Sequence, residues 1–139
     1  MDIREYLNSI KSIEAEIISL QAWVNKYHEL AYSLRGSSFS VHISAKGYVT
    51  SSLETVIVEL VDREKELKSA ICKLTARERE IRNLISQIPD GTYRIILTRK
   101  YLDAQSLSQI AEELHYSDKW IKVLYHRALD MAEKIYNTQ

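Results

Sequence analysis

Residues 106–129 of this 139-residue chain read SLSQIAEELHYSDKWIKVLYHRAL, and the stretch predicts two helices joined by a three-residue turn. Ser106 and Gln109 have the spacing of a capping box, so the first helix is expected to begin at Ser106. Ser117 is suited to cap the second helix, which is expected to span residues 118–136. Apolar residues with helical spacing define the packing side: Ile110, Ala111, Leu114, Ile121, Leu124, Ala128 and Leu129. Short helix, turn and second helix form the helix-turn-helix arrangement.

The turn and the segment before it complete a three-helix module over residues 92–139. His115 stands where the turn often needs a left-handed backbone, a conformation that His tolerates better than β-branched residues do. A preceding helix is expected from Thr92 to Leu102. Its expected inner face consists of Tyr93, Ile96, Leu97 and Tyr101.

The side of helix 118–136 opposite its apolar residues carries basic and titratable side chains. At about 100° per residue, Lys119, Lys122, Val123 and His126 fall on that side. Lysine reaches guanine acceptors or phosphates, and Val123 suits a thymine methyl group. We therefore interpret this helix as a recognition helix for the DNA major groove. The candidate DNA-binding residues are Ser106, Ser117, Asp118, Lys119, Trp120, Lys122, Val123, His126, Arg127, Arg99 and Lys100.

Two long helices, at about 2–35 and 52–88, are expected to fill the first half of the chain. Their apolar residues alternate in steps of three and four, which is the heptad pattern of helices that pack along a seam. The first seam reads Ile3, Tyr6, Ile10, Ile13, Ile17, Leu20, Val24, Tyr27, Ala31 and Leu34. The second reads Leu53, Ile57, Leu60, Glu64, Leu67, Ile71, Leu74, Glu78, Ile81, Ile85 and Ile88. Ser51 or Ser52 is expected to cap the second helix after a loop at residues 36–50.

The heptads predict an all-α fold, in which residues 1–88 form a long helical hairpin or coiled coil before the module. An antiparallel hairpin within the chain and a parallel dimer of two chains both satisfy the pattern, since β-branched residues such as Ile3 and Ile10 suit parallel dimers. Glu64 and Glu78 on the second seam are interpreted as solvent-accessible edge positions.

Charge limits how such a module binds DNA. The chain has nineteen Lys and Arg and nineteen Asp and Glu, and residues 89–139 have seven of each sign. Non-specific DNA affinity is therefore expected to be modest and strongly salt-dependent. Stable binding to double-stranded DNA is expected to need two modules in a homodimer joined through the N-terminal helices, or contacts with RNA polymerase.

No enzyme is indicated by the sequence. Gly36, Gly47 and Gly91 are isolated, so no glycine-rich phosphate loop is present. A zinc site is not expected, because Cys72 is solitary and the histidines His28, His42, His115 and His126 are scattered. We expect no catalytic residues, no metal and no cofactor. A single cysteine fits the cytoplasm, and no apolar run approaches the ~20 residues of a membrane span.

Residues 93–97, 101–102, 106–117 and 128–129 resemble region four of bacterial sigma factors, the module that reads the −35 promoter element. The whole chain is similar to phage and prophage late-operon transcription regulators of the ArpU-like type. The resemblance implies base contacts at Asp118, Lys119, Lys122, Val123 and His126, and a phosphate contact at Ser106. Sigma modules usually have basic residues where Asp118 and Trp120 stand and a polar residue at Val123, so the −35 consensus is not the expected target.

Two other functions fit the same pattern. A small terminase subunit for DNA packaging also joins a helix-turn-helix to a helical oligomerisation region, and it would form rings. A helical adaptor without DNA binding would use the three-helix module as a protein-docking surface. We expect a sequence-specific DNA-binding regulator of transcription, encoded by a phage.

Overall fold

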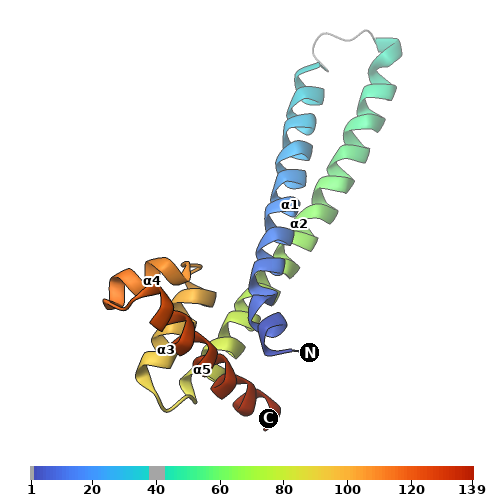
Figure 1. The fold of residues 1–139 in the computed structure, drawn as a ribbon. Coiled ribbons are helices and arrows are strands. Elements are labelled where there is room, and N and C mark those ends of the chain that lie inside the picture. Colours follow the sequence, from blue (N-terminus) through green and yellow to red (C-terminus); the bar gives the residue numbers. More distant parts are fainter. Residues whose placement is uncertain (1, 38–42) are drawn as a thin grey trace. The chain divides into compact units, whose positions relative to one another are not determined.

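The computed structural model describes the backbone of residues 2–37 and 43–139, and the side chains of residues 2–36 and 52–139. Over this part of the chain the protein is all-α, as predicted, and contains no strand (Figure 1). The elements are α1 (Ile3–Ser37), α2 (Ile43–Ser86), α3 (Gly91–Leu97), a π-helical turn η1 (Thr98–Leu102), α4 (Leu107–Leu114) and α5 (Asp118–Asn137). None of these helices, over the described residues, combines the length and apolar character needed to cross a bilayer.

Helix α2 begins at Ile43, whereas the sequence predicted a start beside Ser52 after a loop at residues 36–50. No proline interrupts the segment from Ile43 to Leu53, and extending an existing helix costs far less than starting one. Ser51 and Ser52 consequently lie inside the helix, where no helix start needs a cap. Residues 38–42, including His42, lie outside the described part of the chain.

The chain divides into two compact units, and the division differs from the predicted one after residue 88. The first unit consists of the N-terminal residues through Ser12 together with Leu74–Gln139. The second unit is Ile13–Lys73. The ends of both long helices thus belong with the module. The reason is that α5 has a second apolar face which these ends cover.

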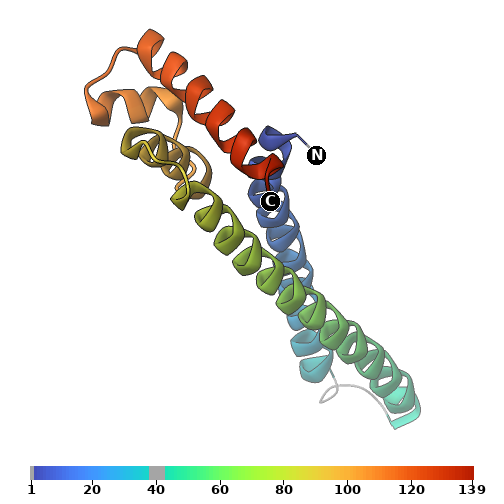
Figure 2. The same ribbon diagram turned by 90° about the horizontal axis from the view of Figure 1, so that it is seen from below.

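That second face lies in the C-terminal half of α5. Ala128 and Ala132 are fully buried, and their small side chains permit close helix approach. Tyr6 in α1 and Tyr136 in α5 have ring centroids 4.8 Å apart, and both views show α5 beside the start of α1 (Figure 2). The main core of this unit consists of Ile3, Leu7, Ile10, Ile81, Leu84, Ile85, Ile88, Leu97, Tyr101, Ala128, Leu129 and Ala132.

Two tyrosines connect this core to the rest of the module. The hydroxyl groups of Tyr101 and Tyr125 are hydrogen-bonded, and the Tyr101 side chain is buried. Burial, followed by the hydrogen bond between the Tyr101 and Tyr125 hydroxyl groups, raises the pKa of Tyr101 well above its usual value. The Tyr101 hydroxyl therefore stays neutral and acts as a structural group.

In the second unit, the facing parts of α1 and α2 run antiparallel along the predicted seam. His28 Nε2 and Glu64 Oε1 are 3.1 Å apart across the pair, and the Glu64 side chain is 43% exposed, which agrees with a solvent-accessible edge. One seam position differs. Ile71 is 45% exposed and the adjacent Ala70 is buried, so the line of contact passes through Ala70 at that turn.

Truncation of Ile88 should test the packing between the ends of the long helices and α5. Ile88 is fully buried, so Ile88→Ala should lower the free energy of unfolding by about 2–5 kcal/mol. The matched control is Ile95→Ala. Because Ile95 is 42% exposed, this variant should lower the free energy of unfolding much less. Urea denaturation followed by circular dichroism measures both; equal losses would contradict the core described above.

Candidate nucleic-acid interface

The start of α4 is fixed by the predicted capping box. The Gln109 backbone N–H donates to Ser106 Oγ at 3.1 Å, and the Ser106 N–H donates to Gln109 Oε1 at 3.0 Å. Both otherwise unpaired N–H groups at this helix end are satisfied by local side chains. The helix therefore begins where the sequence predicted.

The turn after α4 also has the predicted geometry. His115 is left-handed, with φ 61° and ψ 39°, and the Tyr116 N–H donates to the Ala111 carbonyl at 2.8 Å. Ser117 Oγ then accepts the Trp120 N–H at 3.1 Å and caps α5. Hydrogen bonds on both sides of the turn thus set the angle between α4 and α5.

A second apolar cluster holds the two helices together. It consists of the buried residues Ile96, Ile110, Ala111, Ile121 and Leu124, which come from α3, α4 and α5. Ala111 is 1% exposed, as expected of a small residue at a helix crossing. The predicted inner faces of all three helices are buried or half-buried.

The opposite side of the N-terminal half of α5 is exposed. Lys119, Lys122 and His126 are exposed, and Val123 is 36% exposed. We call these four residues the α5 ridge. The 3.6-residue period of the helix places these residues on a different side from Ile121 and Leu124. Apolar packing therefore leaves the α5 ridge accessible.

Residues beside the α5 ridge add charge and aromatic surface. The Arg127 guanidinium lies 5.4 Å from the centre of the Trp120 ring, a cation–π distance. Trp120 is itself 41% exposed. Ser106, Ser117 and Asp118 are exposed at the starts of α4 and α5.

Arg4 lies next to the α5 ridge, and sequence reasoning missed it. Its Nη2 is 3.1 Å from His126 Nδ1; because guanidinium only donates, His126 accepts at Nδ1. Arg4 is held there by Ile3 and Leu7, which are buried in the main core. No local signal in the sequence links residues separated by 122 positions. Only the fold adds this cation to the α5 ridge.

Two basic residues before α4, Arg94 and Arg99, bind groups of the protein itself. Arg99 forms an ion pair with Glu113, and Lys100 is half-buried. Arg94 Nη1 donates to the carbonyls of Ile88 and Pro89 at 2.6 and 2.9 Å, so it closes the end of α2. A phosphate at Arg99 would have to compete with Glu113, whereas Lys119 and Lys122 form no ion pair with any described residue.

Metal-binding geometry is not seen in the described residues: no three His, Cys, Asp or Glu side chains are grouped to hold an ion. Cys72 is exposed as a free thiol. The candidate interface consists of the α5 ridge together with Arg4.

Comparison with known proteins places the chain in one family. It belongs to the family described as "Protein of unknown function (DUF1492)", whose model matches residues 36–137. This match includes α2, α3, α4 and α5. No curated protein and no solved structure matches the chain.

The left-handed turn yields a prediction about stability. Glycine adopts this conformation without steric cost and a β-branched residue does not, so His115→Gly should change unfolding free energy by less than about 1 kcal/mol. His115→Val should lower it by about 1–2 kcal/mol. Thermal unfolding of the two variants compares them at one exposed position. A valine variant as stable as the glycine variant would contradict the turn geometry.

Proposed function

We propose that this member of the DUF1492 family is a sequence-specific DNA-binding regulator of transcription, with α5 as its recognition helix. The observation that carries the proposal is the α5 ridge, whose lysines are exposed while the opposite side of the helix is buried in two cores. The combination of helix, turn and helix with such a ridge is the usual way for a small α-helical domain to present side chains to a major groove.

Each part of the surface has a distinct role in the proposed complex. Lys119 and Lys122 reach base edges or phosphates, and Val123 packs against a thymine methyl group. Ser106 and Ser117 hold the starts of α4 and α5, whose N–H groups face backbone phosphates. Arg4 extends the contact to a phosphate beyond His126. Asp118 and the Trp120–Arg127 pair border the groove.

Transcription is favoured by resemblance. Residues 93–129 are similar to sigma region four, and the chain is similar to ArpU-like phage and prophage late-operon regulators. We propose accordingly that the protein is phage-encoded, works in the cytoplasm without cofactor or catalytic activity, and contacts RNA polymerase or a second copy. The balanced charge of residues 89–139 favours such assistance, because one neutral module binds weakly.

Loss of the two ridge lysines should abolish tight binding. The test uses DNA fragments that the purified protein selects from the source genome. The Lys119→Ala/Lys122→Ala variant should raise the Kd for these fragments by about 10–100-fold, because such contacts contribute roughly 1–3 kcal/mol to the binding free energy. Lys134→Ala is the matched control, since Lys134 is exposed near the end of the same helix. Gel shifts measure all three proteins. Equal binding by wild type and double variant would remove the recognition-helix assignment.

Arg4 should contribute a phosphate contact. Arg4→Ala is expected to weaken binding several-fold for all fragments and to reduce the slope of log K against log salt by about one. Arg79→Ala is the control, because Arg79 is an exposed arginine in the same compact unit. An unchanged salt dependence in Arg4→Ala would show that Arg4 does not touch the DNA backbone.

A further inference from the structure

The second unit leaves much of its apolar surface uncovered. Among the described residues of Ile13–Lys73, the buried hydrophobic residues are Ile13, Val24, Ala31 and Ala70. The exposed large hydrophobic residues are Ile18, Trp23, Leu30, Tyr32, Val58, Val61 and Ile71. Two packed helices cannot enclose a core by themselves, and exposed apolar surface of this kind marks interaction sites.

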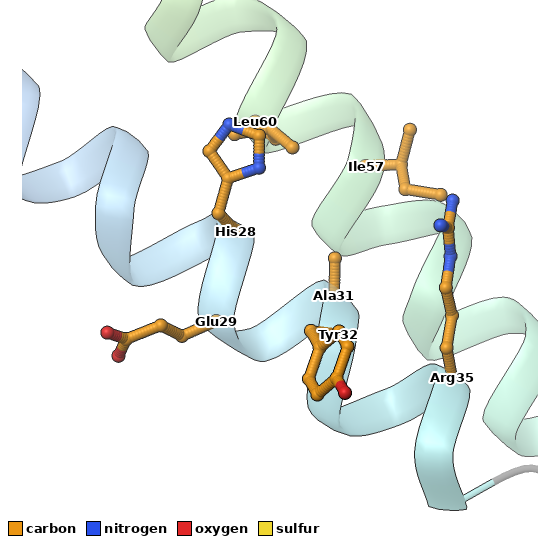
Figure 3. Close-up of a pocket in the computed structure, with 7 residues that line it drawn as sticks. All are labelled: His28, Glu29, Ala31, Tyr32, Arg35, Ile57 and Leu60. Carbon is orange, nitrogen blue, oxygen red and sulfur yellow. The ribbon is translucent and has the colours of Figure 1, made fainter.

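The two helices also leave an open groove between them. It is about 620 Å³ in volume, and Figure 3 shows Ala31 of α1 facing α2 near Ile57, while Glu29 points away. The small side chain of Ala31 fills little of the space opposite Ile57 and Leu60. The apolar contact between α1 and α2 is consequently incomplete in the part of α2 where Val58 and Val61 are exposed.

One line of residues on α2 combines this apolar surface with opposite charges at its two ends. The α2 stripe consists of Glu54, Val58, Val61, Lys65 and Lys68, which are all exposed and are spaced in steps of four and three. Such steps keep residues on one side of a helix. Glu54, Lys65 and Lys68 pair with no side chain among those described. Among the described side chains the stripe therefore has no charged partner, and it has unlike charges at its ends.

We propose that the α2 stripe binds the α2 stripe of a second copy of this chain, antiparallel, with the two-fold axis at Val61. In that register Val61 meets the partner's Val61, and Glu54 lies opposite the partner's Lys68 at both ends. A parallel alignment would place Glu54 on Glu54 and Lys68 on Lys68, which are repulsive pairs. Charge thus selects the antiparallel arrangement, and a self-complementary patch gives a closed two-fold dimer.

This inference deepens the proposed function, because it names the surface that would bring two DNA-binding modules together. Its test measures self-association without DNA. A failure here would leave the recognition-helix proposal intact, and a failure of DNA binding would leave the α2 dimer intact.

Disulfide cross-linking tests the register directly. Val61→Cys in a Cys72→Ser background should form a covalent dimer on mild oxidation with copper phenanthroline, since residues on a two-fold axis lie within disulfide reach. The wild-type chain is the matched control. Its Cys72 is exposed on the same side of α2 but eleven positions from the axis, so two copies are separated by about 33 Å at 1.5 Å per residue. It should stay unlinked.

Charge variants test the same register independently. Lys68→Glu should raise the dimer Kd by about tenfold or more in sedimentation equilibrium, because two attractive pairs become repulsive. Adding Glu54→Lys should restore the affinity. Circular dichroism checks that helicity is retained.

Cross-linking of both Val61→Cys and Cys72 would indicate parallel pairing and overturn the proposal. Absence of a Val61→Cys dimer would overturn the proposal as well. The same result is expected if the α2 stripe binds a different protein. If the Glu54→Lys/Lys68→Glu variant dimerises no more tightly than Lys68→Glu alone, the pairing of Glu54 with Lys68 is contradicted.

Discussion

The burial of α5 on two different sides along its length is the constraint on which the module depends. Ile121 and Leu124 pack into the cluster with α3 and α4, whereas Ala128, Leu129 and Ala132 pack into the core with α1 and α2. A helix held at both ends in this way has little rotational freedom. The position of the α5 ridge is consequently determined by apolar packing within the protein itself.

The short connection before α5 has the same effect at a local level. The His115 and Tyr116 N–H groups bond carbonyls at the end of α4 and Ser117 caps α5, all within five residues along the chain, so the turn does not rely on distant contacts. Binding surfaces that are preorganised lose less entropy on association. In the proposed DNA complex this would matter, because long-range attraction to DNA would provide little of the affinity of a module with balanced charge.

Much of the fold was predictable because the decisive signals are local. Heptad spacing, the capping box at Ser106 and the left-handed His115 depend on residues within one or two turns, and the structure has them where expected. The start of α2 was not predictable, since Ser51 and Ser52 are compatible with both a cap and a helix interior. At the candidate site, the exposure of Lys119 and Lys122 follows from periodicity. The proximity of Arg4 to His126 and the pairing of Arg99 with Glu113 require the tertiary structure.

The central claim is the proposal that DNA covers the α5 ridge. Lysine acetylation footprinting by mass spectrometry, with and without a bound genomic fragment, measures this for each lysine. The account predicts that DNA protects Lys119 and Lys122, whereas the exposed Lys134 and Lys73 react as they do in the free protein. Unchanged reactivity of Lys119 and Lys122 in the complex would contradict it.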